Sequence, residues 1–287
     1  MPISVRGLIH TYDPDTPFAR QVLFGVDLEV GDGEIVGIAG PSRSGKSTLA
    51  QYLGGLLRPR QPGMVVIDGI DTGAPDADIA AVRTRVGMVF QFPEDQLFER
   101  TVELDVGYAP RLMKMNPADV EARVREALET VGMPFEEFRG RPVHALSGGQ
   151  KRRVAVAGVL AKGCRTLVLD EPTAGLDPLG REEMLELVAS LHRQGLTIVM
   201  ISNQLEELAR MVERLVVLAE GRVAADGPVR RVVSDAALLA STGLRPPGTV
   251  AAMQAFAAAG LPVRTDCLTV DEVCDEVARA AGGVRRA

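Results

Sequence analysis

Short apolar runs alternate with helix-forming segments along most of the chain. Apolar runs at residues 3–12, 22–30, 34–39, 63–68, 86–91 and 166–169 predict strands. Residues 47–57, 76–85, 118–131 and 151–161 predict helices. Strands that alternate with helices are typical of an α/β fold, and runs of this kind suit a buried parallel sheet. The first two strands are joined by residues 13–17, where two prolines and two aspartates predict a loop.

Two regions depart from this alternation. From residue 93 to residue 161 the pattern becomes helical, which indicates a helical subdomain within the α/β domain. Its segment 118–131 begins with acidic residues and has regular apolar spacing, as an amphipathic surface helix does. Residues 235–287 form the second region, where prolines at 246, 247 and 262 separate short helical segments. We therefore expect an α/β domain at residues 1–234 and a small helical appendage at residues 235–287.

The composition narrows the class of protein. Hydrophobic residues make up 46% of the 287 residues but aromatic residues only 4%, which indicates an aliphatic core. A net charge of −6 argues against a nucleic-acid partner held by bulk electrostatics. Because no apolar run approaches about 18 residues and the first residues lack signal-peptide features, we expect a cytosolic protein. Cys164, Cys267 and Cys274 lack metal-ligand spacing and are expected to be free thiols.

The most specific chemical pattern lies between the predicted strand 34–39 and the helix that follows it. It consists of Gly40, Pro41, Ser42, Arg43, Ser44, Gly45, Lys46, Ser47 and Thr48. This is the P-loop pattern GxxxxGK[ST] in its strand, loop and helix context, so a nucleoside triphosphate is the expected ligand. Lys46 is expected to reach the β- and γ-phosphates, and Ser47 to supply a hydroxyl to Mg²⁺. The alternative is a glycine- and serine-rich turn that matches by accident.

Two strand-end residues are candidates for the same site. Tyr12 ends the first strand, where an aromatic ring is able to stack on a purine base, although ordinary strands also end in tyrosine. Gln91 ends the strand 86–91, and the carboxyl ends of strands face the ligand crevice of an α/β sheet. We interpret Gln91 as a contact of Mg²⁺ or of the attacking water. The alternative is a solvated loop glutamine.

Two adjacent acids, Asp170 and Glu171, follow the predicted strand 166–169. In this position Asp170 is expected to hold Mg²⁺ through its hydration shell, and Glu171 to orient or deprotonate the attacking water. Adjacent acids after a strand also occur on solvated surfaces. Downstream of a P-loop, we favour the catalytic interpretation.

A second anion-binding helix terminus is predicted near residue 147. It consists of Ser147, Gly148, Gly149 and Gln150, with Ser147 as the N-cap of the helix 151–161. The chain has only one P-loop but two anion-binding sites of this kind. We therefore expect the second site to serve the nucleotide of another molecule. Taken alone, the segment is an ordinary glycine-rich N-cap.

In type and order these motifs resemble those of the ATP-binding cassette (ABC) ATPases, over about residues 3–233. Tyr12 matches the A-loop aromatic, residues 40–48 Walker A, Gln91 the Q-loop, residues 146–150 the signature and residues 167–171 Walker B. Residues 174–177 match the D-loop, which assigns Asp177 to the nucleotide interface. The resemblance implies a P-loop NTPase cassette with a RecA-like core sheet and N-terminal antiparallel strands. It also implies that two cassettes sandwich two ATP molecules head to tail.

A narrower resemblance points to the ATPases of energy-coupling-factor (ECF) transporters. It rests on residues 13–18, 90–99, 146–161 and 180–183, and on the tail at 243–281. The family implies an ATP-hydrolysing subunit at the cytoplasmic face of the cell membrane that powers import of a micronutrient, either a vitamin or a transition-metal ion. Its implied partners are a second homologous ATPase, a transmembrane coupling subunit and a substrate-binding membrane subunit.

Alternatives to two of these implications stay open. The family tail helps to join the two ATPase subunits, but the appendage here is alternatively a helical cap packed on its own domain. The competing function is a soluble ABC ATPase that works in DNA repair, translation or iron–sulfur assembly. Long coiled-coil insertions or tandem cassettes would favour that function, and the sequence contains neither.

Two residues differ from the family pattern. Arg43 stands where Walker A has a glycine, so it must adopt an allowed backbone geometry or cost roughly 1 to 2 kcal/mol of strain, which pairing with phosphate would offset. Asn203 stands where the family has its switch histidine; it donates a hydrogen bond but cannot shuttle a proton. We therefore expect an unequal pair, in which a different partner keeps the histidine and has the faster site. The alternative is that Asn203 works nearly as well as histidine.

Residues 92–98 place apolar and acidic side chains in one loop beside Gln91. In the resembled family this region receives a short helix of the transmembrane subunit. Leu97 and Phe98 are therefore expected to be exposed apolar anchors of that interface.

Overall fold

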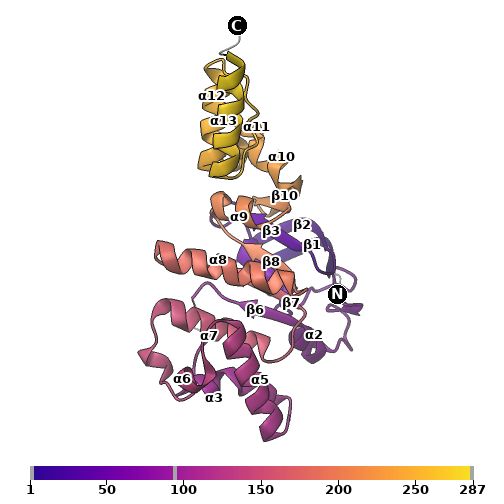
Figure 1. Ribbon diagram of the computed structural model, residues 1–287. Helices are drawn as coiled ribbons and strands as arrows, with labels where there is room; N and C mark the ends of the chain where they lie inside the picture. The colour runs from indigo at the N-terminus through magenta and orange to yellow at the C-terminus, as the bar shows by residue number, and fades with distance from the viewer. Residues whose placement is uncertain (1–2, 93–95, 285–287) are drawn as a thin grey trace.

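The computed structural model describes residues 3–92 and 96–284, which form two β-sheets and the helices around them (Figure 1). A four-stranded antiparallel sheet has the order β2 (Arg20–Val30), β1 (Ile3–Tyr12), β4 (Val65–Ile67) and β5 (Ile70–Asp71). A six-stranded sheet has the order β10 (Arg222–Pro228), β9 (Arg214–Ala219), β3 (Ile35–Ala39), β8 (Thr197–Ile201), β7 (Thr166–Asp170) and β6 (Val86–Val89). In this sheet β9, β3, β8, β7 and β6 are parallel and β10 is antiparallel. The predicted α/β class, with N-terminal antiparallel strands, is confirmed.

The helices form three groups along the chain. Those that accompany the sheets are α1 (Lys46–Leu53), α2 (Ile79–Arg85), α8 (Pro178–Arg193), α9 (Leu205–Met211) and α10 (Val229–Ser234). Between β6 and β7 lie α3 (Val102–Val106), α4 (Tyr108–Leu112), α5 (Pro117–Thr130), α6 (Phe135–Phe138) and α7 (Gly148–Leu160). The chain then ends in α11 (Ala236–Thr242), α12 (Gly248–Ala258) and α13 (Val270–Val284), which stand away from the sheets (Figure 1).

The central strands contribute side chains to two hydrophobic cores. On β8, Ile198 and Met200 pack into a core with α5, α7, α8 and α9, whereas Val199 and Ile201 pack into a core between the two sheets around α1. Successive side chains of a strand point to opposite faces, so a continuous apolar run serves both cores. Each fully buried aliphatic side chain contributes about 1.5–3 kcal/mol to stability.

Among the helix boundaries that differ from those predicted, two have a clear local cause. The first helix was expected to reach residue 57 but ends at Leu53, because Gly54 and Gly55 follow it and glycine has low helix propensity. The helix expected at residue 151 begins at Gly148. Ser147 is its N-cap, as predicted. Its hydroxyl accepts a hydrogen bond from the backbone N–H of Gln150, and the side-chain oxygen of Gln150 accepts one from the backbone N–H of Ser147. This capping box satisfies two N–H groups and so lets the helix start earlier.

The parallel strands bring four loops to one edge of the sheet. Because β3, β8, β7 and β6 run in the same direction, the loops that follow their carboxyl ends lie side by side. These loops begin at Gly40, Phe90, Glu171 and Ser202. They carry most of the candidate site residues.

The C-terminal helices are attached to the sheet domain by polar contacts and by buried apolar residues. The Arg230 guanidinium of α10 donates to Glu272 of α13 at 2.9 Å, and the Gly248 amide that opens α12 donates to Glu206 of α9 at 2.7 Å. Leu239 of α11, Val250 of α12 and Leu268, which precedes α13, belong to the same core as α5, α7, α8 and α9. In the described ranges no helix combines the length and apolar character needed to cross a bilayer.

Candidate functional site

The P-loop folds around the ammonium group of Lys46. Its Nζ atom donates to the carbonyl oxygens of Gly40 at 2.8 Å and Pro41 at 2.9 Å, and the side chain is buried. Burial lowers the pKa of Lys46, while the negative charges of Glu171 and Asp170 oppose that shift. The lysine is therefore a buried cation held by backbone oxygens beside two acids.

Two glycines are required for the close packing of this loop. A Cβ atom on Gly40 would lie 2.1 Å from the backbone oxygen of Leu218, and one on Gly45 would lie 2.6 Å from a methyl group of Leu23. Gly45 also has a φ of 102°, which L side chains rarely adopt. Gly45 leads directly into α1, so the loop presents the amino end of that helix to a ligand.

Arg43 adopts a left-handed backbone with a φ of 67°. This conformation costs a non-glycine residue roughly 1–2 kcal/mol, so of the two alternatives that the sequence left open the structure has the strained one. The exposed Arg43 side chain lines a hollow of about 220 Å³, which we call the P-loop hollow. Its lining residues are Tyr12, Arg20, Val22, Arg43, Gly45, Lys46, Ser47 and Thr48.

Tyr12 is fixed at the rim of the P-loop hollow. Its hydroxyl lies 3.0 Å from the Thr48 hydroxyl, and its ring meets that of His10 edge to face at 4.3 Å between centroids. His10 is itself bonded to the hydroxyl of Tyr52 at 2.8 Å. The predicted purine-stacking residue is thus partly exposed and held in one orientation beside the P-loop.

The two acids at the end of β7 are buried. Burial raises the pKa of Asp170, against a hydrogen bond from Ser47 and the charge of Lys46. Glu171 has a φ of 51°, and its carboxylate accepts hydrogen bonds from the Asn203 amide at 2.8 Å and the Ser202 hydroxyl at 3.4 Å. Burial also raises the pKa of Glu171, against these bonds and Lys46.

The switch position and the Q-loop glutamine are placed at the same sheet edge. The backbone of Asn203 holds Glu171, while the Asn203 side chain is exposed. Gln91 is half-buried, and its backbone oxygen accepts a hydrogen bond from the side chain of Arg152 at 2.7 Å. The structure therefore brings Lys46, Asp170, Glu171 and Asn203 together, as the sequence predicted.

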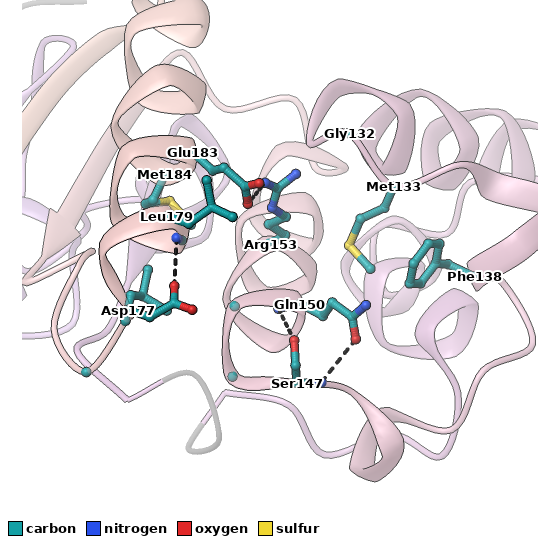
Figure 2. A pocket seen from close by; sticks show the side chains of 15 residues that line it. Gly132, Met133, Phe138, Ser147, Gln150, Arg153, Asp177, Leu179, Glu183 and Met184 are labelled. Carbon is teal, nitrogen blue, oxygen red and sulfur yellow. Dashed lines mark hydrogen bonds and ion pairs between the residues drawn. The ribbon is translucent and has the colours of Figure 1, made fainter.

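The remaining predicted residues lie elsewhere, in a separate hollow of about 640 Å³ (Figure 2). We call it the signature hollow; Ser147, Gly148, Gly149, Gln150 and Asp177 line it together with residues of α8 and Met133. Asp177 caps α8 by accepting from the Gly180 amide at 2.7 Å, and Arg153 donates to Glu183 at 2.6 Å. The signature and P-loop hollows have no lining residue in common.

One expected anchor of the docking loop is not exposed. Leu97 is partly buried and packs against the core with α5, α7, α8 and α9, so its predicted exposure was wrong. The exposed apolar residues here are Phe92 (52%) and Phe98 (66%), and the Phe98 ring meets Tyr108 of α4 edge to face at 4.8 Å. The acidic residues expected in this loop, Glu94 and Asp95, lie outside the described residues.

Sequence reasoning missed a buried carboxylate beside the site. Glu207 of α9 accepts from the Thr173 hydroxyl at 2.6 Å and pairs with Arg181 of α8 at 3.3 Å. It ties the turn after Glu171 to two helices. A single acid in a helical segment gives no sequence signal of burial, since acidic residues are normally exposed.

The residues around the P-loop fit a nucleoside triphosphate with Mg²⁺. The Ser44 hydroxyl is buried and has no hydrogen-bond partner among the described residues, and Lys46 supplies a buried cation. Such donors suit phosphate oxygens. Ser47 and Asp170 offer hydroxyl and carboxylate oxygens, the ligand types that Mg²⁺ prefers.

Comparison with known proteins agrees with this geometry. Residues 23–174 match the family model described as ABC transporter. Energy-coupling factor transporter ATP-binding protein EcfA2 of Symbiobacterium thermophilum is 46% identical over 95% of this chain and 94% of its own length. EcfA1 of the same organism is 47% identical over 89% of this chain and 88% of its own.

A solved structure with the same fold is cbiO1 from Clostridium perfringens, described as part of the ABC transporter complex cbiONQ. It is 34% identical, with a TM-score of 0.72, and covers 85% of this chain and 94% of that one. The chain thus has the ABC-cassette form of the P-loop NTPase fold, and it belongs to the energy-coupling factor transporter ATP-binding proteins of the ABC transporter family.

Proposed function

We propose that this chain binds Mg-ATP at its P-loop, hydrolyses it, and thereby powers an ECF-type importer of a vitamin or transition-metal ion. One observation carries the proposal: Lys46, Asp170 and Glu171 are buried together at the sheet edge, and the Asn203 amide holds the Glu171 carboxylate. Phosphoryl transfer to water needs a cation that binds the phosphates, an acid that holds Mg²⁺ and an oriented general base.

Each residue has a distinct part in the proposed reaction. Lys46 and the loop amides bind the phosphates, and Tyr12 stacks on the base. Ser47 and Asp170, with Gln91 nearby, would hold Mg²⁺, which would neutralise charge that develops on the phosphates. Glu171 accepts a proton from the attacking water, and its raised pKa makes it a stronger base than an ordinary carboxylate.

A second cassette is needed to complete each site. The signature hollow is lined by a different set of residues and shares none of them with the P-loop hollow. A head-to-tail partner would bring its own signature to this P-loop and its own nucleotide to Ser147. We propose a homologous but different partner, because Arg43 and Asn203 alter only this chain's own site. The similarity to both EcfA1 and EcfA2 of one organism supports such a pairing.

The membrane partners are proposed to dock beside the Q-loop. Phe98 and Tyr108 are exposed with their rings in contact, and Phe92, which follows Gln91, and Leu112 at the end of α4 are exposed as well. Exposed apolar side chains of this kind are typical of an interface. A transmembrane coupling subunit seated there would hold the chain peripherally at the cytoplasmic face and connect it to the substrate-binding membrane subunit. The appendage of α11 to α13 is proposed to help join the two ATPases.

Nucleotide binding tests the first part of this proposal. Lys46→Ala removes the buried cation, and we expect Mg-ATP affinity of the isolated chain to fall by about 100-fold or more. The matched control is Lys114→Ala, which removes an exposed lysine of the turn after α4 and should leave affinity unchanged. Circular dichroism checks that both variants are folded. Wild-type affinity in the folded Lys46→Ala chain would overturn the assignment of the P-loop.

Membrane association tests the docking surface. In cells that express the transporter, the double change Phe92→Asp and Phe98→Asp should release the chain from the membrane fraction, because it places two charges in an apolar interface. Mg-ATP binding should be retained. Phe18→Asp is the control, since Phe18 is also exposed but lies in the loop between β1 and β2. If the wild-type chain never co-sediments with membranes, the competing soluble ATPase function is favoured; if the double variant still sediments, the dock lies elsewhere.

A further inference from the structure

A buried arginine one turn into α7 joins three parts of the site. Arg152 follows Ser147 to Gln150 in the helix that the signature opens, and its side chain is only 4% exposed. Its guanidinium donates to the backbone oxygens of Gln91 at 2.7 Å, Pro172 at 2.9 Å and Ala174 at 2.7 Å. One side chain of the signature helix thus binds both the loop after β6 and the turn after β7.

These bonds hold the loop after β6 and the turn after β7 firmly to α7. A hydrogen bond from a charged donor contributes about 1.5–3 kcal/mol, and a buried cation that loses its acceptors is costly, so the three bonds resist separation. The planar guanidinium directs its donors to carbonyls in two loops at once, whereas the ammonium of lysine is a compact point charge on a flexible stem. A movement of α7 would therefore act directly on the backbone at Gln91 and at the turn that follows Glu171.

The turn after β7 has a special need for such support. Glu171 has a left-handed φ of 51°, a conformation that persists in a non-glycine residue only where the surroundings hold it. The turn is closed by the Ala174 amide, which donates to the Glu171 oxygen at 3.1 Å. Arg152 binds the oxygens of Pro172 and Ala174 within this turn. It therefore supports the backbone that aims the Glu171 carboxylate.

We propose that Arg152 is a positioning residue that relays nucleotide occupancy at this chain's signature to its own Q-loop and Walker B turn. The inference rests on the proposed function, because it needs a partner's nucleotide at Ser147 and hydrolysis in the paired complex. It adds a physical connection between the two ATP sites of the pair. Arg152 touches no phosphate in this scheme and acts through Gln91 and Glu171.

The test is steady-state ATPase of a transporter complex in which the partner's general base is already replaced, so that turnover reports this chain's own site, with Arg152→Lys or Arg152→Gln added to this chain. We expect about a 10-fold loss of turnover and a Hill coefficient for ATP that falls toward 1. Mg-ATP affinity of the isolated chain should stay within about two-fold of wild type, because the P-loop is untouched. Arg210→Lys is the matched control: Arg210 makes a two-bond ion pair with Glu182 between α9 and α8, outside the site, and its loss should change neither quantity.

A double-mutant cycle with Gln91→Ala separates positioning from a general structural role. If Arg152 acts through the Q-loop, Arg152→Gln combined with Gln91→Ala should lose less than the product of the two single losses. Fully multiplicative losses, or a parallel fall in Mg-ATP affinity and melting temperature of the isolated variant, would overturn the proposal. Failure of the wild-type chain to bind Mg-ATP would instead overturn the proposed function, so the two failures are distinguishable.

Discussion

The P-loop hollow and the signature hollow differ in how their polar groups are used. Around the P-loop, buried charged groups interact across different elements: Lys46 lies beside Asp170 and Glu171, and Asn203 holds Glu171. In the signature hollow, Ser147 and Asp177 cap the helices that they begin, and one partly exposed ion pair, Arg153 with Glu183, joins α7 to α8. The first arrangement is sensitive to each of its members, while the second depends mainly on its own helix ends.

Both departures from the family pattern lie in the half that is sensitive to each of its members. Arg43 and Asn203 both lie in the half of the site that this chain builds for itself. The signature half keeps its predicted residues and its capping geometry. We infer that this chain contributes more to its partner's ATP site than to its own.

The largest expected effect comes from blocking the signature hollow. Ser147→Arg places a long cation where the partner's nucleotide would lie, and we expect ATPase of the reconstituted complex to fall by about 100-fold. Mg-ATP binding by the isolated chain is the internal control and should not change. Retention of full turnover would show that the signature hollow takes no part in the reaction.

A smaller effect is expected from the general base of this chain. Glu171→Gln removes the proton acceptor, and a general base contributes about 10²–10⁴-fold at the site that carries turnover. In an unequal pair the partner's site carries it, so this change should lower turnover of the complex less than about three-fold. The equivalent change in the partner should lower it about 100-fold. Equal losses, or full activity of this chain as a homodimer, would contradict the unequal pair.

The smallest expected effect is an increase in turnover. Asn203→His restores a side chain that is able to shuttle a proton, and it should raise turnover at this chain's own site by about three-fold. The measurement uses a complex in which the partner's general base is already replaced, so that only this site contributes. The Asn203 side chain is exposed, so the change should not destabilise the fold. Unchanged turnover would support the alternative that asparagine works nearly as well as histidine.

The sequence predicted β3, β6 and β7 of the six-stranded sheet and the motif residues of the site, because both depend on local patterns, but no strand was predicted at β8, β9 or β10. Apolar runs mark the strands, and Lys46, Asp170 and Ser147 lie in motifs whose spacing carries chemistry. It could not predict that Leu97 is partly buried, since burial of one residue in a loop depends on distant helices. Nor could it predict that Arg152 and Glu207 are buried, because charged residues are usually exposed and their partners here come from separate elements.

The two cores described above share their strands, and this has a consequence for how the protein denatures. Residues of β3, β7 and β8 alternate between the core around α1 and the core beneath α8, so neither core can lose its packing while the other stays intact. Small single domains melt in an all-or-none manner, and the shared strands extend that coupling across both cores here. The sheet domain should therefore show one calorimetric transition. A substitution that disrupts either core should also disturb the nucleotide site, which lies at the ends of the strands that the two cores share.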